Sequence, residues 1–522
     1  MKTLTIREYL FFVYFGMMLW IKGIGLVGGG FYNLILFFGS LTVLVITFMG
    51  RTTPAVFAVC LVLLFAVGIL PWRISGNQGP LWCILFVMAA KDMEPKRIAA
   101  FGVRIWGMAF CVQMITQLTW LRTRDFVIHD KSFGYVIRWA MGYSHPNVFQ
   151  ISYGILVMLL FYIYRPRGRK LILSVLLALF GGAWVFINSL STTGAVFLVA
   201  FLFFYTAFDM CRKEPYPAVV RVLTYAVLPV ALVFSLILPL VLDGRAFDIM
   251  NRIMSTRYAM TRRFMTESGL TLFGAGIVFG HSEMIDCSFA NLLILGGTVP
   301  FILMCAAYIY TLHRLLAEHD GPAIAIVIAC MIAGISEPFM FNTSYKNISL
   351  IFVAAELGRL VTELKLKPDM LTDVVYPLPL LEKRVKSPVF FSTDVMKKVI
   401  SVLFISACLL GILGNLLKPV PETVYALRAS CDVPDSMPIL HLTVEEAETI
   451  RDDRGSWLLN YVDEATPMHR FTGSIVRTEK VRVIISTLML AAAACFAAVY
   501  MLPRAFAGEA SGKRRRTEDK RE

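Results

Sequence analysis

RPRGRKLILSVLLALFGGAWVFINSLSTTGAVFLVAFLFFYTAFDMCRKE, residues 165–214, contains two long apolar runs between two clusters of positive charge. The runs, 171–188 and 193–210, are each close to the roughly 20 residues that an α-helix needs to cross a bilayer core of about 30 Å. Lys and Arg collect on the cytoplasmic side of membrane helices. The stretch therefore predicts two transmembrane helices joined by a short outer turn, with both charge clusters in the cytoplasm.

The same alternation of apolar runs and short charged clusters extends over nearly the whole chain. Of its 522 residues 57% are hydrophobic, and the mean hydropathy of +0.68 is far above that of soluble globular domains. The runs are continuous, which predicts helices and not the alternating strands of a barrel. We therefore predict an all-α polytopic membrane protein of about fourteen transmembrane helices. They cover residues 9–28, 30–49, 54–71, 80–91, 97–121, 147–164, 171–188, 193–210, 219–242, 289–312, 321–336, 346–364, 397–416 and 481–503.

The charge pattern also predicts which side of the membrane each loop faces. Both termini are expected in the cytoplasm. Residues 122–146, 243–288, 337–345 and 417–480 are then external, and the acidic stretch 443–453 predicts a short solvated helix. The predicted parts of the chain are a transmembrane core at 1–365, a cytoplasmic linker at 366–396, two helices at 397–503 flanking the external segment 417–480, and a basic cytoplasmic tail at 504–522.

The formal net charge of 50 − 36 = +14 does not indicate nucleic acid as a partner. Many of the positive residues lie in short clusters between apolar runs, which is the pattern that orients membrane helices. Lys22 and Glu356 lie inside apolar runs but near helix ends, so we expect their side chains to extend toward the membrane surface. The histidines and cysteines lack metal-ligand spacing, and GAGIVFG lacks the setting of a dinucleotide-binding turn. No metal and no cofactor are predicted.

The element GYSHPN, residues 142–147, stands in front of the apolar run 147–164. Ser144 is expected to cap this helix, and Pro146 suits its first turn. Neither role accounts for His145. An imidazole at the outer mouth of a helix bundle can exchange protons near neutral pH or donate a hydrogen bond to a phosphate.

The external segment 243–269 carries five arginines against the orientation rule: Arg245, Arg252, Arg257, Arg262 and Arg263. A cluster of this kind forms a solvated face, holds anionic lipid headgroups, or clamps a diphosphate. The third alternative is attractive because the guanidinium fork matches phosphate oxygens.

These elements together resemble the Wzy-type polysaccharide polymerases of the O-antigen polymerase and ligase superfamily. The resemblance covers about residues 1–365, and two positions depart from it. The turn 189–196 has no arginine, and Cys287 follows the acidic residue where relatives often have asparagine. Arg263 and Gly274 also have the R-x(10)-G spacing of periplasmic loops in such polymerases. The matching residues are Gly142, Tyr143, His145, Pro146, Asn147, Arg257, Leu272, Phe273, Gly274, Gly276, Asp286, Ser288, Phe289 and Gly296 or Gly297.

The resemblance implies a GT-C-like core of about twelve helices, followed here by two more. It also implies a glycosyltransferase that moves a growing glycan from undecaprenyl diphosphate to a sugar hydroxyl of the next lipid-linked repeat unit. The product is capsule, exopolysaccharide or O-antigen, made at the outer face of the bacterial cytoplasmic membrane. A chain-length regulator and a flippase are the implied partners.

Site residues follow from this chemistry, which needs a stabilised diphosphate and a base for the acceptor hydroxyl. Arg257 and Arg263 are the leading clamp residues, with Arg262 and Arg252 behind them. His281 is the preferred base, with Glu283 and Asp286 as alternatives. His145 and Asn147 are expected to orient the acceptor or a phosphate.

Two other functions fit the same architecture. A ligase would transfer the glycan to another acceptor with the same chemistry. A transporter, such as a flippase for lipid-linked oligosaccharide, should line its central helices with charge. The arginines are concentrated in one external loop instead, which favours chemistry at the outer face.

Overall fold

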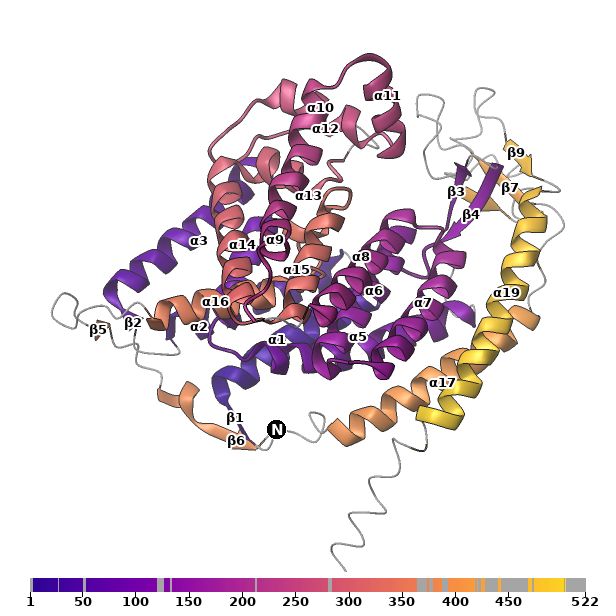
Figure 1. Ribbon diagram of the computed structural model, residues 1–522, viewed down its shortest axis with the longest axis horizontal. Helices are drawn as coiled ribbons and strands as arrows, with labels where there is room; N and C mark the ends of the chain where they lie inside the picture. Colours follow the sequence, from indigo (N-terminus) through magenta and orange to yellow (C-terminus); the bar gives the residue numbers. More distant parts are fainter. Residues whose placement is uncertain are drawn as a thin grey trace, which may run out of the picture.

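The computed structural model shows a mostly helical chain whose helices form one bundle (Figure 1). Among the residues that it describes, nine helices are long and apolar enough to cross a membrane. The described residues are 3–26, 28–49, 53–119, 126–131, 134–211, 214–279, 284–363, 373–374, 379–386, 393–417, 420, 424–427, 440–442, 468–471, 474–501 and 503. The tail 504–522, the stretch 443–453 and most of 417–480 lie outside them.

Every predicted apolar run coincides with one helix or with consecutive helical segments. The helices are α1 (Ile6–Gly23), α2 (Gly30–Met49), α3 (Ala55–Ser75), α4 (Gly79–Ala90), α5 (Pro95–Leu118), α6 (Pro146–Tyr164), α7 (Arg169–Ser189), α8 (Thr192–Met210), α9 (Ala218–Leu232), η1 (Val233–Ile237), α10 (Leu238–Val241), α11 (Gly244–Ile253), α12 (Arg257–Ser268), α13 (Ser288–Asn291), η2 (Leu292–Gly296), α14 (Thr298–Ala317), α15 (Gly321–Gly334), η3 (Pro338–Phe341), α16 (Leu350–Glu363), η5 (Pro379–Glu382), α17 (Thr393–Leu417), α19 (Ser474–Phe496) and η8 (Ala497–Met501).

The predicted helix at 289–312 is interrupted at Gly297, between η2 and α14. Gly297 has φ +92°, and a Cβ there would come within 2.5 Å of the Leu272 carbonyl oxygen. The segment after α12 lies in this close approach, where Thr298 and Val299 donate backbone hydrogen bonds to Thr271 and Leu272. A continuous helix would close that space, so the glycine sets the path of the chain toward Asp286.

α15 and α16 have 14 residues each, which corresponds to about 21 Å of helix against a bilayer core of about 30 Å. The loop 335–349 between them was predicted in part as an external segment, 337–345. Each of its residues is buried or half-buried, so the loop packs into the protein, while its external side stays a prediction. Irregular polar backbone at membrane depth is stable only where protein or water surrounds it. The two short helices therefore bring polar groups into the bundle.

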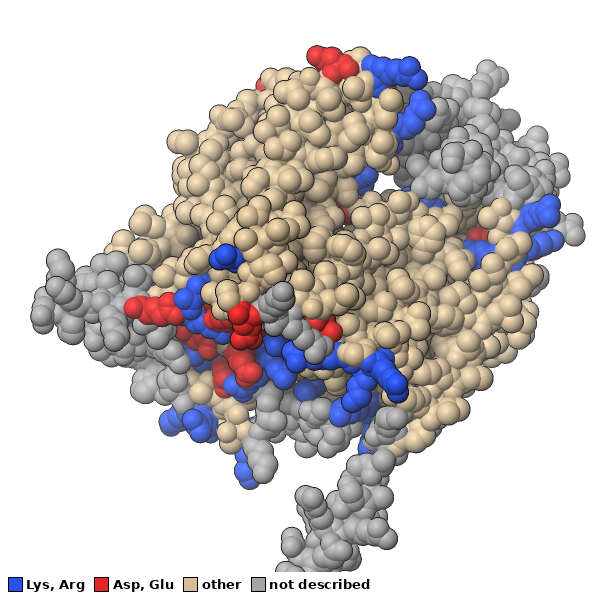
Figure 2. All heavy atoms as spheres, viewed as in Figure 1, with Lys and Arg blue, Asp and Glu red and all other residues tan. Residues whose placement is uncertain are grey.

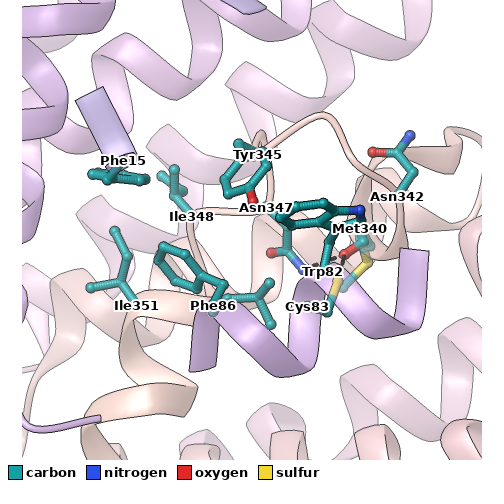
Figure 3. A pocket seen from close by; sticks show the side chains of 11 residues that line it. Phe15, Trp82, Cys83, Phe86, Met340, Asn342, Tyr345, Asn347, Ile348 and Ile351 are labelled. Carbon is teal, nitrogen blue, oxygen red and sulfur yellow. Dashed lines mark hydrogen bonds between the residues drawn. The ribbon is translucent and has the colours of Figure 1, made fainter. Parts of the chain in front are cut away.

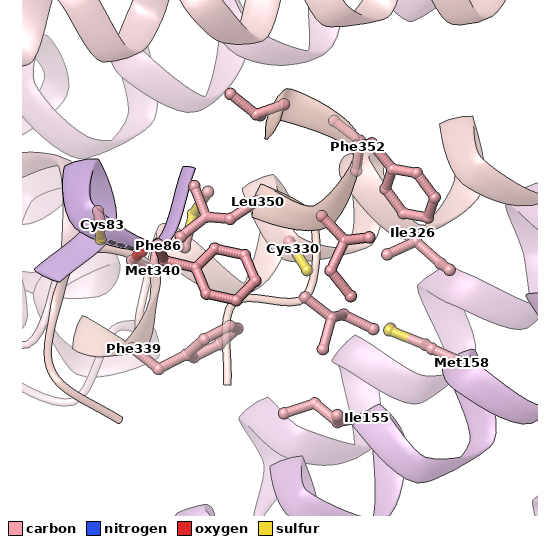
Figure 4. Packing of buried hydrophobic residues seen from close by; sticks show 14 of the residues in the cluster. Cys83, Phe86, Ile155, Met158, Ile326, Cys330, Phe339, Met340, Leu350 and Phe352 are labelled. Carbon is pink, nitrogen blue, oxygen red and sulfur yellow. Dashed lines mark hydrogen bonds between the residues drawn. The ribbon is translucent and has the colours of Figure 1, made fainter. Parts of the chain in front are cut away.

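α15 forms the centre of the bundle. Nearly all of its residues are buried, as expected for a helix that is apolar on every side. It packs most extensively against α8 and also contacts α9, α14, η3 and α6, and its side chains share one buried cluster with those of α4 and α16 (Figure 4). Members of this cluster are Cys83, Phe86, Ile155, Met158, Ile326, Cys330, Phe339, Met340, Leu350 and Phe352.

The predominantly helical structure agrees with the predicted all-α class, and short strands add to it at both ends of the bundle. Within the predicted external segment 122–146, β3 (Phe126–Lys131) pairs antiparallel with β4 (Gly134–Trp139). The segment 417–480 contributes a three-stranded sheet in the order β8-β7-β9. At the other end, the linker 366–396 pairs with the N-terminal part of the chain. The strands concerned are β1 (Thr3–Thr5) with β6 (Arg384–Lys386), β2 (Thr53–Pro54) with β5 (Asp373–Val374), and β7 (Val424–Leu427) with β8 (Leu440–Leu442) and β9 (Met468–Phe471).

The two C-terminal helices, α17 and α19, are in contact with the core. α17 lies against α5, and α19 contacts α7, α17 and β4. α19 contains a buried ion pair, in which Nε of Arg482 lies 2.7 Å from the carboxylate of Glu479. Trp139 of β4 donates to the same carboxylate at 2.9 Å, and Arg482 donates to Oδ1 of Asn188 at 2.5 Å. The strand β4 is therefore attached to the last helix.

Replacing Glu479 by Ala is expected to lower the free energy of unfolding by about 3–5 kcal/mol, because it leaves the buried Arg482 without its counterion. The melting temperature of the purified protein in detergent measures this. Glu267→Ala is the matched control, since that carboxylate is 54% exposed and its pair with Arg263 is worth at most about 1 kcal/mol. Equal melting temperatures for the two variants would contradict the assigned role of the pair.

Charged side chains gather in several regions of the face in Figure 2. A mixed band of both signs lies near the end that carries the N-terminus, a second group with basic and acidic atoms lies at the opposite end near α11, and a further group lies on the side of α19. Ion pairs in the mixed band include Arg165 with Asp320 at 2.7 Å and Arg359 with Glu356 at 3.0 Å. Glu356 is thus buried and paired, and does not extend toward the membrane surface as predicted.

Candidate functional site

Five polar side chains from five separate segments meet beside the end of α15. Oε1 of Glu337 accepts a hydrogen bond from Nδ2 of Asn147 at 2.8 Å and lies 3.5 Å from Nη2 of Arg257. The same Nη2 lies 3.2 Å from Oδ2 of Asp286. Arg138 donates from β4 to Oδ1 of Asn147 at 2.7 Å. Two arginines, two carboxylates and one amide form one connected group, which we call the Glu337 cluster.

The start of α6 positions Asn147. His145 has an extended backbone and caps the helix, because its Nδ1 accepts a hydrogen bond from the backbone N–H of Asn147 at 3.2 Å. Pro146 occupies the first turn, as predicted, but the capping residue is His145 and not Ser144. The Asn147 amide is then oriented by its partners, since Arg138 only donates and the Glu337 carboxylate accepts.

Gly142 is required just before this helix. Its φ is +76°, and a Cβ would lie 1.8 Å from Nε2 of Gln113. A larger residue would be strained at this φ and would displace the side chain of Gln113. Gly142 therefore allows the turn to lie close to α5. This placement in turn positions Asn147 at the start of α6.

Arg257 is the first residue of α12, and its side chain is 14% exposed. Nη1 donates to the Met254 carbonyl at 3.2 Å, which holds the guanidinium in place. Among the described residues, its buried Nε–H has no acceptor. Arg257 thus reaches both carboxylates of the cluster and keeps one donor unused, which suits a residue that receives an anionic ligand.

The loop after α15 is held by Ser288. Its hydroxyl donates to the backbone carbonyl of Glu337 and accepts from the N–H of Met340 at 3.2 Å. Ser288 begins α13, directly after Asp286 and Cys287. The same short stretch therefore supplies one carboxylate of the cluster and fixes the backbone that carries the other.

Burial, with a smaller contribution from the negative charge of Asp286, raises the pKa of Glu337 to about 7 overall. The positive charge of Arg257, the hydrogen bond from Asn147 and the charge of Arg138 act in the opposite direction. Burial also raises the pKa of Asp286 and lowers that of Arg138, to about 10. A carboxyl group that titrates near neutral pH between two arginines can take up a proton during a reaction.

Four of the predicted site residues lie in or next to the cluster: Arg257, Asn147 and Asp286 inside it, and His145 as the cap beneath Asn147. The structure does not describe His281 or Glu283.

The other predicted arginines point elsewhere. Arg262 donates to the Pro239 carbonyl at 2.6 Å and pairs with Asp243 at 3.1 Å, so it closes the end of α10. Arg263 is 49% exposed and pairs with Glu267 one turn along α12. Arg252 is exposed in the last turn of α11. The expected clamp of Arg257 with Arg263 is therefore not formed; Arg138 is the second arginine of the cluster.

Sequence reasoning missed Glu337 and Arg138. Glu337 was placed at the start of an external segment, although a single carboxylate directly before Pro338 at the end of a wholly apolar run is an available signal. Arg138 lies in the stretch 134–139, which is rich in aromatic and β-branched residues typical of strands, and the segment was treated only as a loop.

A small apolar cavity lies between α4 and the loop 335–349, under Trp82, Phe86 and Tyr345 (Figure 3). Its volume of about 20 Å³ is room for one water molecule. It therefore contributes to packing around the loop and is too small for a substrate. Larger space is visible in Figure 2, which shows a recess beside α12 with basic and acidic atoms inside it.

Within the described residues, no group of three or more His, Cys, Asp and Glu side chains is arranged to hold a metal ion. Comparison with protein-family models, with curated proteins and with solved structures finds no match to this chain.

Proposed function

We propose that this protein is a membrane glycosyltransferase that polymerises undecaprenyl-diphosphate-linked repeat units at the outer face of the bacterial cytoplasmic membrane. The observation that carries the proposal is the buried Glu337 carboxyl, held between the Asn147 amide and Arg257. The motif resemblance supplies the substrate class. The predicted orientation with cytoplasmic termini and fourteen crossings belongs to the same proposal.

In the proposed reaction, the acceptor hydroxyl oxygen attacks the anomeric carbon of the donor glycan. The bond from that carbon to the diphosphate oxygen breaks, and the diphosphate leaves with the electron pair. The hydroxyl proton passes to the carboxylate of Glu337. Arg257 stabilises the leaving diphosphate through its fixed guanidinium donors.

The ion pair between Glu337 and Arg257 couples these two events. Before the reaction, the carboxylate partly neutralises the guanidinium at 3.5 Å. Once Glu337 takes the proton, its charge disappears, and the full positive charge of Arg257 acts on the diphosphate as that group gains negative charge. Proton uptake and leaving-group stabilisation therefore reinforce each other.

Deletion of the gene, followed by analysis of lipid-linked intermediates, tests the function. Single repeat units on undecaprenyl diphosphate are the expected product. Full-length polymer that stays on the lipid would point to a ligase, and repeat units trapped on the cytoplasmic leaflet would point to a transporter. Either of these results overturns the proposal.

The rate of polymerisation is expected to rise with pH through about 7, because Glu337 must lose its proton before it can accept one. Asp286→Asn should move this rise to lower pH, since the negative charge of Asp286 raises the pKa of Glu337. Initial rates across a pH series measure the shift. Asp243→Asn, at a carboxylate that is 85% exposed, is the control and should leave the profile unchanged. A rise at the same pH in Asp286→Asn and in the wild type would argue against Glu337 as the titrating group.

A further inference from the structure

Two buried lysines lie on the other side of the loop that carries Glu337. Lys22 is in the last turn of α1 and 6% exposed, and Lys346 is in the loop 335–349 and 8% exposed. Lys22 was expected to extend toward the membrane surface. Instead, its Nζ lies 4.2 Å from the ring centroid of Tyr32 at the start of α2. Both lysine side chains are therefore largely buried.

Several hydroxyl groups are carried by the same elements as these lysines. Tyr32 donates to Oγ1 of Thr343 at 3.5 Å, and the backbone N–H of Lys346 donates to Oγ of Ser344 at 3.4 Å. The hydroxyls of Tyr14 and Tyr345 share a hydrogen bond. α1, α2 and the loop 335–349 thus converge on a polar interior region that follows directly from the Glu337 cluster along the chain.

No carboxylate pairs with either lysine among the residues that the structure describes. A buried ammonium without a counterion is costly, and two of them close together cost more. Burial and the charge of Lys22 lower the pKa of Lys346 to about 7, against the opposing effect of Glu337. The aromatic face of Tyr32 offsets only part of this cost. A bound anion would supply the negative charge that the two lysines lack.

We infer that Lys22 and Lys346 bind the diphosphate of the lipid-linked donor substrate, next to the Glu337 cluster. This inference rests on the proposed function. The donor diphosphate carries at least two negative charges, which matches two ammonium groups, and it must lie close to the carbon that is attacked. Lys22 and Lys346 would hold the diphosphate that remains on the polyprenol, while Arg257 faces the oxygen that leaves the sugar.

Binding of undecaprenyl diphosphate to the purified protein in detergent tests the inference, with the shift in melting temperature as the readout. Lys22→Met and Lys346→Met are each expected to weaken binding about tenfold or more, because each removes a charge-assisted contact. Without ligand, both variants should melt at the wild-type temperature or above it, since each loses an unpaired buried charge. Lys480→Met, at an exposed lysine of α19, is the control and should bind as the wild type does.

Three results would overturn the inference. The first is unchanged affinity in both lysine variants. The second is an equal, lysine-dependent shift with phosphatidylglycerol, which would assign the lysines to an ordinary phospholipid. The third is an equal, lysine-dependent shift with inorganic diphosphate at the same concentration, which would assign them to a soluble anion.

The failure of the proposed function gives a different pattern. A Glu337→Gln variant that polymerises at the wild-type rate would remove the proposed base, while lysine-dependent binding of undecaprenyl diphosphate would still support the anion site.

Discussion

Replacing Glu337 by Gln is expected to lower the rate of polymerisation by about 10²–10⁴, the range found when a general base is lost. Gln has the same shape, and its amide oxygen can still accept the hydrogen bond from Nδ2 of Asn147, which is 2.8 Å away in the wild type. The fold should therefore persist. The measurement is the initial rate with purified lipid-linked repeat units, at pH values on both sides of 7.

Two comparisons separate this role from a structural one. Glu267→Gln changes an exposed carboxylate on α12 and should keep the wild-type rate. Glu337→Asp keeps a base in the cluster and should recover part of the activity. The residual rate of Glu337→Gln should also lack the rise with pH near 7. Retention of that rise in the Gln variant would assign it to another group.

Arg257→Met is expected to lower the rate by about 10²–10³, which is the usual loss when one group that stabilises developing negative charge is removed. The variant also removes the positive charge that lowers the pKa of Glu337, so the rise of activity should move to higher pH. Arg257→Lys keeps the charge but not the planar fork, and an intermediate rate is expected. Initial rates and melting temperatures from the same preparations separate lost chemistry from lost folding.

Arg263→Met is the matched control on the same helix. Its guanidinium is 49% exposed and pairs with Glu267, so the substitution should change the rate little. The two arginines are six residues apart, which places them about 120° apart around the helix axis. If Arg263→Met were as damaging as Arg257→Met, the cluster would not be the site of catalysis.

The helices could be predicted from the sequence because hydropathy is a local property. Each apolar run is long enough to be recognised without knowing its neighbours. The strands β3 and β4 were missed for the opposite reason, since two short runs of mixed residues gain stability mainly from pairing with each other. The burial of the segment 337–345 was not predicted, because hydropathy does not reveal that α15 and α16 are short.

The candidate site was predictable only in part. Asn147, Arg257 and Asp286 each lie at the start of a helix or just before one, so topology alone places them at one end of the bundle. Glu337 joins them because the short α15 leaves its loop within the bundle, and Arg138 because β4 pairs in one register. The positions of Glu337 and Arg138 thus depend on how the elements pack and pair. Helix periodicity did offer a correction, because a spacing of six residues on one helix turns Arg263 away from Arg257.

The contacts of β4 indicate the order in which parts of this protein can fold during synthesis. Successive residues of a strand face opposite sides, so Arg138 reaches Asn147 while its neighbour Trp139 reaches Glu479 of α19. Ribosomes deliver Glu337, Arg257 and Asn147 long before residue 479 emerges. β4, which carries Arg138, makes its contact with Glu479 only after α19 has been synthesised. The contacts among Asn147, Arg257, Asp286 and Glu337 can therefore form before the contact between β4 and α19 does.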